Sequence, residues 1–176
     1  MDFLWKLLER IEYLESSINE LDRRQNNMFR EATVKEVLPD EGLAVVDANG
    51  IETSKVPWLE RAGKIRSWQP PSVGERVVLF SPTGEPGLGM VMPGGFSDEF
   101  PAPHNKGGEY MQVIGGATIK QTGDAVEITV NGVTVKISGA GLEVTGGKVK
   151  HNDHDIGDTH KHTEVEPGGG LSGPPA

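Results

Sequence analysis

Glycine divides residues 110–151 into short segments in which apolar and polar residues alternate. Val126, Ile128 and Val130 illustrate the alternation, whose period of two is typical of a β-strand with one apolar face. An Asn-Gly pair at 131–132 predicts a tight hairpin between two of the segments. We therefore expect a local antiparallel meander. Its segments are YMQVI, ATIKQT, AVEITV, VTVKIS, LEVT and KVKH.

The apolar face of these strands has no predicted cover within one chain. Residues 107–176 contain no helical pattern, and no aromatic residue follows Tyr110. Only 35% of the whole chain is hydrophobic, and 24 Gly and 12 Pro interrupt it, so a self-sufficient core is not expected in this region. An exposed flat sheet would aggregate. We expect the face to be buried against further copies of the chain, as in a β-helix or an intertwined β-prism.

Residues 1–30 are predicted to form a helix, because residues 1–29 contain neither Gly nor Pro. Apolar residues recur there at alternating steps of three and four, which is a heptad pattern. Two interpretations stay open: a helix lying on its own domain, or a coiled coil. Ile at a and Leu at d nominally favour two strands, so this zone alone predicts a dimer. The apolar positions are Leu4, Leu7, Ile11, Leu14, Ile18 and Leu21.

Residues 31–95 are predicted to form five or six short strands separated by turns, among them a strand over 63–68. A chain of this length with such strands suits an OB-like barrel. OB barrels bind oligonucleotides through aromatic platforms, for which Trp58, Trp68 and Phe80 are candidates. We expect these rings to fill the barrel core instead, because acidic residues outnumber basic ones eleven to seven over residues 31–106.

Several classes of function are disfavoured by composition. The chain has no Cys, which excludes disulfides, thiolate metal sites and cysteine nucleophiles. Its net charge of −9 argues against a nucleic-acid partner. Asp2 and other charges interrupt the N-terminal apolar residues, and no run of eighteen apolar residues occurs. We expect a soluble product made in the cytoplasm without a signal peptide.

Four of the five histidines lie within residues 151–162. On an extended strand, His160 and His162 present both imidazoles on one side. Two nitrogens from one chain hold a transition metal weakly, whereas three copies around an axis supply six, an octahedral set that suits Fe²⁺ or Ni²⁺. A solvated polar loop is the simpler alternative. A cupin-like metalloenzyme is another, because Glu166 and Gly173 follow at cupin spacing, but the later strand with a further ligand is missing.

The chain resembles the baseplate assembly protein V family, the spike proteins of contractile phage tails, whose relatives form the spikes of R-type pyocins. The resemblance covers nearly the whole chain. It rests on VPWLERAG, SVGERVVLFSP and GLGMVMPG in the predicted barrel and on the terminal GDTHKHTEVEPGGGLSGPP. It implies a mainly β fold: an N-terminal helix, an OB-like barrel, and an intertwined trimeric triple-stranded β-helix or prism with a metal-bound apex.

The resemblance also implies ligands and partners. His160 and His162 of each of three chains would bind one Fe²⁺ per trimer, and Asp153, Asp155 and Asp158 are candidates for Ca²⁺ in the apex. The partners implied are the other two chains of a homotrimer, the hub and tube proteins of the baseplate, and the host outer membrane, with no nucleic acid and no small-molecule substrate. The protein would lie at the tip of the baseplate of a virion or tailocin.

The resemblance therefore implies a non-enzymatic spike that pierces the bacterial outer membrane mechanically. The alternatives are a cupin-like metalloenzyme that uses His160 and His162, and an OB-type nucleic-acid-binding protein. The expected domains are a helix over 1–30, a barrel over 31–95, a linker over 96–109, a β-helix or prism over 110–150 and an apex over 151–176.

Overall fold

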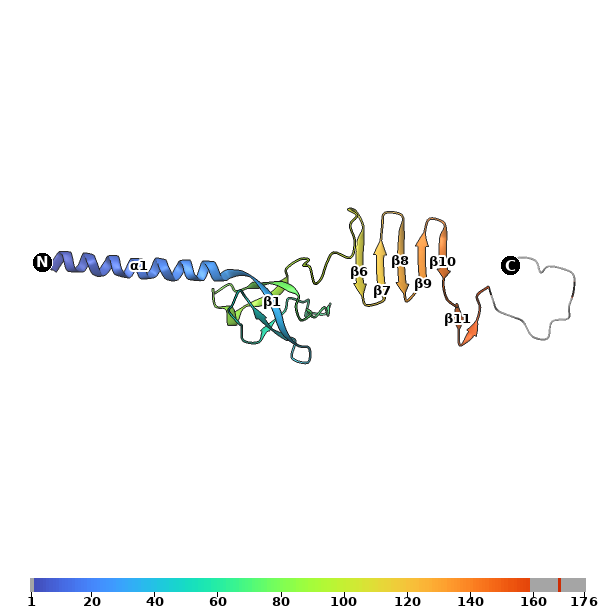
Figure 1. Ribbon diagram of the computed structural model, residues 1–176, viewed down its shortest axis with the longest axis horizontal. Helices are drawn as coiled ribbons and strands as arrows, with labels where there is room; N and C mark the ends of the chain where they lie inside the picture. Colours follow the sequence, from blue (N-terminus) through green and yellow to red (C-terminus); the bar gives the residue numbers. More distant parts are fainter. Residues whose placement is uncertain (1, 159–167, 169–176) are drawn as a thin grey trace. The chain divides into compact units, whose positions relative to one another are not determined.

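The computed structural model describes residues 2–158 and residue 168 and is mainly β, with one long N-terminal helix, as predicted (Figure 1). It divides into two compact units, Met1–Ala102 and Pro103–Ala176. The first unit holds the helix and a barrel, and the second holds a five-stranded sheet and a small hairpin. Within the described part of the chain, no helix is both long enough and apolar enough to cross a membrane.

Helix α1 spans Asp2–Met28, and strand β1 (Phe29–Leu38) begins at the next residue. The last turns of α1 contact the barrel. Arg23 forms an ion pair with Glu85 at 2.7 Å, and the Ser81 N–H donates to the Met28 carbonyl at 2.8 Å. Residues 3–16 of the helix are all exposed. It does not lie along its own domain, so the first of the two interpretations of the heptad pattern is wrong.

The barrel is built on a five-stranded sheet in the order β3-β2-β1-β4-β5, with all neighbours antiparallel. The sheet closes where Trp58, just after β3, pairs with Val91 of β5 in a parallel bridge. The Leu59 N–H donates to the Val91 carbonyl at 2.8 Å. A short 3-10 helix, Pro86–Leu88, precedes β5. The other strands are β2 (Leu43–Asp47), β3 (Val56–Pro57), β4 (Arg76–Phe80) and β5 (Met90–Pro93).

Inward-facing residues of these strands form the core of the barrel. They alternate with exposed residues, as expected for strands with one face buried. The core is small and aliphatic apart from Trp58, which is 9% exposed. Its members are Ala32, Val34, Ala44, Val46, Ala48, Val56, Trp58, Val77, Leu79 and Val91.

Two expectations for the barrel are wrong. Residues 63–68 form no strand, only a bridge between Ala62 and Arg66 in a loop. Trp68, which ends this loop, is 60% exposed and meets Trp58 edge to face at 5.3 Å, so it does not fill the core. Phe80 is only partly buried and stacks on Phe29 at 4.8 Å. Four of the nine residues between the two tryptophans are charged, and the large apolar residues of this loop, Leu59 and Ile65, are both exposed, so no buried side chain anchors a strand there.

The second unit contains an antiparallel meander in which strands neighbouring in sequence are neighbours in the sheet, in the order β10-β9-β8-β7-β6. Asn131 and Gly132 have φ of 48° and 91° and connect β8 to β9, which confirms the predicted hairpin. The strands are β6 (Tyr110–Ile114), β7 (Ala117–Gln121), β8 (Ala125–Val130), β9 (Val133–Ser138) and β10 (Gly141–Thr145), followed by a hairpin of β11 (Lys150–His151) and β12 (His154–Asp155).

The core of the described chain lies entirely in the first unit. None of residues 103–158 is buried, and residue 168 is exposed. The shortage of core-forming residues that the sequence predicts therefore lies in the second unit, which contains the meander.

Candidate functional site

The two faces of the β6–β10 sheet carry different kinds of side chain. The pairing register aligns residues of the same kind on neighbouring strands, so that they form rows across the sheet. Ile119 of β7 lies opposite Ile128 of β8, which lies opposite Val135 of β9. A second row passes from Val126 to Ile137. These rows make up what we call the apolar face: Ala117, Ile119, Val126, Ile128, Val130, Val133, Val135, Ile137, Leu142 and Val144.

The opposite face, called the polar face here, carries a row of charges with alternating sign. Lys120 lies opposite Glu127, Glu127 opposite Lys136, and Lys136 opposite Glu143. The Lys136 Nζ lies 3.2 Å from a Glu127 carboxylate oxygen. Opposite charges in directly facing positions stabilise a sheet. A parallel row is made of Thr118, Thr129, Thr134 and Thr145, in which the Thr129 and Thr134 hydroxyls lie 2.9 Å apart.

In the single chain, most residues of the apolar face are exposed, whereas most residues of the polar face are partly buried. The usual order is the reverse. On the polar face, Glu127 and Lys136 are partly buried against their neighbours. On the apolar face, Ile128 is 45% exposed, Ile137 is 58% exposed and Leu142 is 69% exposed. Contiguous exposed apolar surface of this kind marks an interaction site. The arrangement therefore suits association through the apolar face, with the polar face left toward water.

An ion-pair cluster lies where the second unit begins. His104 Nε2 lies 2.8 Å from a Glu109 carboxylate oxygen, and Lys120 Nζ lies 3.1 Å from the same oxygen. The Lys120 ammonium, and then the His104 ring, hold the pKa of Glu109 below its ordinary value of 4.5. The cluster links the chain before β6 to the C-terminal end of β7. Neither this cluster nor the charged row was predicted, although the Lys and Glu of successive segments were visible signals.

The β11–β12 hairpin leads toward the predicted metal motif. Asn152 and Asp153 form its turn, with φ of 47° and 65°. The Asp155 carboxylate lies 3.6 Å from Lys148 Nζ and accepts the Gly157 N–H at 3.0 Å. Asp153 and Asp158 are exposed.

Among residues 2–158 and 168, no three His, Asp or Glu side chains are grouped so as to hold a metal ion. His160 and His162, the predicted iron ligands, lie outside the described residues. The iron site and the calcium site both stay predictions.

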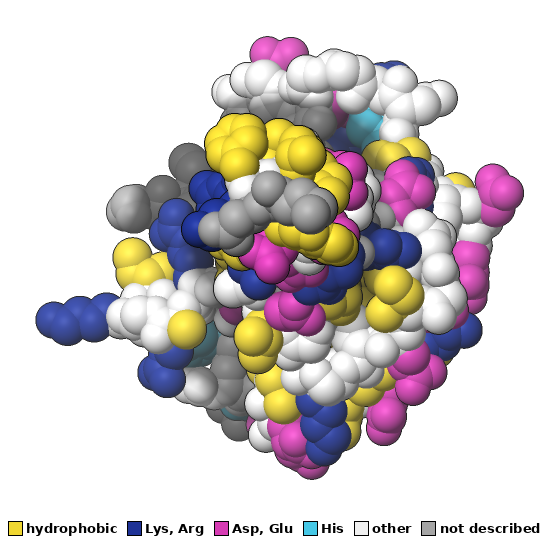
Figure 2. Space-filling model, turned by 90° about the vertical axis from the view of Figure 1, so that its left-hand side faces the viewer, with side chains coloured by type: hydrophobic (Ala, Val, Ile, Leu, Met, Phe, Trp, Pro, Cys, Tyr) yellow, Lys and Arg dark blue, Asp and Glu magenta, His cyan; other side chains and the backbone are white. Residues whose placement is uncertain are grey.

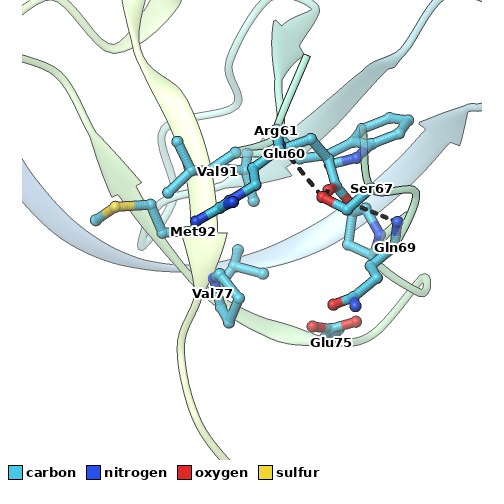
Figure 3. Close-up of a pocket in the computed structure, with 12 residues that line it drawn as sticks. Glu60, Arg61, Ser67, Gln69, Glu75, Val77, Val91 and Met92 are labelled. Carbon is cyan, nitrogen blue, oxygen red and sulfur yellow. Dashed lines mark hydrogen bonds between the residues drawn. The ribbon is translucent and has the colours of Figure 1, made fainter. Parts of the chain in front are cut away.

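A cavity of about 440 Å³ opens on the barrel beside β5 and the loop that follows β3 (Figure 3). Glu60 lies at its wall and accepts hydrogen bonds from the Ser67 hydroxyl and the Gln69 N–H. The charged lining consists of Glu60, Glu75 and Arg61. A nucleic-acid strand requires a basic groove, and this lining has more acidic than basic groups. The contacts of Glu60 instead brace the loop between the two tryptophans.

Apolar side chains also form a continuous exposed stripe along α1, called the helix seam here. Figure 2 views the helix from its N-terminal end and shows hydrophobic side chains gathered around that end, with charged groups beside them. The least exposed member of the seam is still 43% exposed. Its members are Leu4, Leu7, Ile11, Leu14, Ile18 and Leu21.

Comparison with known proteins assigns two regions of the chain. The Type VI secretion system/phage-baseplate injector OB domain matches residues 30–96, which confirms the OB prediction. The GpV apex motif matches residues 158–176. The spike protein of Escherichia phage P2 is 33% identical over 119 residues, which make up 66% of this chain and 56% of that protein. The match thus spans somewhat more than half of the length of this relative.

Proposed function

Because this chain belongs to the baseplate assembly protein V family of phage tail spike proteins, we propose that it forms the trimeric spike at the tip of a contractile tail baseplate. In this proposal the spike pierces the bacterial outer membrane mechanically and catalyses no reaction. The barrel docks on the hub and tube proteins of the baseplate, and the C-terminal unit points toward the target membrane. The particle is a phage virion or a tailocin.

The exposure of the apolar face is the observation that carries this proposal. Three sheets of this kind can close around a common axis with their apolar faces inward, because the inward residues are Val, Ile, Leu and Ala and no aromatic ring has to fit. The polar faces, already paired by their charged and threonine rows, then form the outer surface. A shaft built this way buries its apolar rows without a helix or a second sheet.

The C-terminal motif would complete the tip. His160 and His162 of the three chains offer six imidazole nitrogens, a donor set that suits Fe²⁺. A bound metal supplies linkage between chains, because ligands from three chains must stay together to hold it. Held in this way, the chain ends would resist fraying when force acts along the shaft. Asp153, Asp155 and Asp158 remain candidates for an additional Ca²⁺.

Sedimentation and metal analysis of the purified chain test the assembly. We expect about three times the 18.9 kDa of one chain and about one third of an iron per chain. His160→Ala with His162→Ala removes the iron and leaves the trimer, whereas the matched control His151→Ala with His154→Ala keeps both. A monomer would refute the spike. One metal per monomeric chain would instead support the cupin-like enzyme, and salt-sensitive binding of single strands would support the nucleic-acid binder.

Piercing is tested on assembled particles. Host cells with a periplasmic β-lactamase hydrolyse an external chromogenic substrate faster when the outer membrane is breached. We expect this hydrolysis to rise on particle contraction and to fall when the particles carry the His160→Ala, His162→Ala spike. The purified spike alone, without a contracting tail, should leave the membrane intact. Breach by the isolated spike would contradict a purely mechanical role.

A further inference from the structure

We propose that the α1 helices of three chains form a parallel, in-register coiled coil, in which each helix seam is covered by the seams of the other two copies. The number three rests on the proposed trimeric spike. The pairing of α1 with α1, its direction and its register rest on observations of the helix itself.

The seam runs nearly the whole length of the helix and has no partner among the described residues of its own chain. Leu4 is 62% exposed, Ile18 is 56% exposed and Leu21 is 64% exposed. Residues at such spacing lie on one side of a helix. With 27 residues, α1 is about 40 Å long, so the seam is a long narrow stripe rather than a local patch. Such a stripe matches another helix better than it matches a globular surface.

Charged residues beside the seam favour a parallel arrangement of the α1 helices over an antiparallel one. With Ile11 and Ile18 at a, Arg10 takes a g position and Glu15 the following e position. Parallel helices in register bring Arg10 of one chain beside Glu15 of the next, which is an attractive pair. An antiparallel arrangement brings e positions together, so Glu15 and Asp22 of one chain would face the same carboxylates of another. Like charges in facing positions are destabilising.

Two features favour three helices over the two that Ile at a and Leu at d nominally prefer. Phe3 at g is 76% exposed and Leu8 at e is 51% exposed, and these flanks widen the apolar stripe enough to contact two neighbours. The helix is also fixed to its barrel without a linker: Met28 ends α1 and Phe29 starts β1. Each chain that joins the spike therefore brings one helix to the same end.

Gln25 continues the seam at the next a position, where it is exposed. A single polar residue at an a position fixes register, because its side chain finds a partner only when the equivalent residues lie in one layer. Three Gln25 amides in one layer can hydrogen-bond to one another. The polar layer also lies close to the junction with β1, so the helices would be aligned where the barrels begin.

The chain contains no Cys, so single engineered cysteines report the arrangement in the full-length protein without interference. We expect Leu4→Cys and Leu21→Cys, near the two ends of the seam, each to form an interchain disulfide under mild oxidation. The matched control is Ser16→Cys, at an f position on the outer side. Disulfide dimers on a non-reducing gel are measured together with the sedimentation mass of the reduced protein.

Each outcome separates this proposal from the proposed function. Cross-linking of both seam positions but not of Ser16→Cys, in a trimer, supports the coiled coil. A trimer in which the seam positions cross-link no faster than Ser16→Cys overturns it and leaves the spike intact. A further variant, Leu14→Cys, tests the direction, because Leu14 lies near the middle of the seam. If it cross-links while Leu4→Cys and Leu21→Cys do not, the helices are not parallel. A dimer overturns the number three, and a monomer refutes the spike itself.

A charge swap gives a second readout that does not depend on removing an apolar residue. Arg10→Glu places two carboxylates at the parallel g–e contact, and we expect it to slow cross-linking of Leu4→Cys several-fold. Arg10→Glu with Glu15→Arg restores the pair and should restore the rate. If the single and the double variant cross-link equally fast, the proposed register is wrong.

Discussion

Replacing Ile128 by Asn places an amide in the middle of the apolar face without changing the charge of the chain. Ile128 is central in β8, opposite Ile119 on one side and Val135 on the other. In the single chain it is 45% exposed, so about half of its surface is available for burial by other copies. If three apolar faces close against one another, the amide enters an interior in which the facing rows offer it Ile and Val.

The cost follows from the exposed fraction. Full burial of an Ile side chain is worth about 1.5–3 kcal/mol, so the half that other copies would cover contributes about 1 kcal/mol per chain. An amide buried without a hydrogen-bond partner costs a further ~1–3 kcal/mol. The two effects together amount to about 2–4 kcal/mol per chain, or about 6–12 kcal/mol for three chains. At about 1.4 kcal/mol for each tenfold change, the trimer should dissociate at least about four orders of magnitude more readily.

Sedimentation velocity over a range of protein concentrations measures this change. The matched control is Thr118→Asn, which replaces a β-branched residue on the polar face of the adjacent strand. We expect the control to sediment as the parent trimer does. Intrinsic tryptophan fluorescence, to which the buried Trp58 and the exposed Trp5 and Trp68 all contribute, monitors the barrel, which should stay folded in both variants. Association unchanged in Ile128→Asn, or weakened equally in Thr118→Asn, would refute the assignment of the apolar face as the interface.

Three further predictions concern contacts within one chain. Gly84 has φ of 73°, and a Cβ there would lie 2.5 Å from the Arg24 Cα. Gly84→Ala should therefore lower the free energy of unfolding of the first unit by about 1–3 kcal/mol in urea titrations. An unchanged free energy of unfolding would contradict this close contact. Because the pKa of Glu109 is lowered, its contribution to stability is present above its ordinary pKa of 4.5 and lost as the pH falls through the lowered value. Glu109→Gln should therefore melt earlier than the parent at pH 7 and converge with it in acid, and a gap that stays constant with pH would argue against the ion pair with Lys120. Lys136→Glu reverses one sign in the charged row and should cost about 0.5–1 kcal/mol in thermal melts at low salt, with the loss shrinking as salt is added.

Much of the fold could be predicted from local patterns in the sequence. The alternation of Val126, Ile128 and Val130 predicted a strand with one apolar face, and an Asn-Gly pair predicted its hairpin, because both signals depend only on neighbouring residues. The heptad pattern likewise predicted α1. The strand expected over 63–68 and the burial of Trp68 failed because both depend on how a loop packs against the rest of the barrel.

The candidate site was predictable only in part. The need to cover the apolar face follows from composition and strand period, and the structure confirms that this face is exposed in one chain. The charged row on the other face was missed because it depends on register: Lys120, Glu127 and Lys136 lie in different strands and meet only once each hairpin is aligned. The contact of His104 with Glu109 crosses a loop, for which no period exists.

The placement of every buried side chain of the described residues in the first unit has a kinetic consequence. The barrel can reach its native state by a first-order process within a single chain. If the apolar faces of three chains close against one another as proposed, the β6–β10 sheet buries the exposed part of its apolar face only when chains meet, so the rate at which it becomes stable should rise steeply with protein concentration. During synthesis, newly made chains would then carry a folded barrel and a protease-sensitive second unit until assembly, and the local concentration of chains would set how long that vulnerable interval lasts.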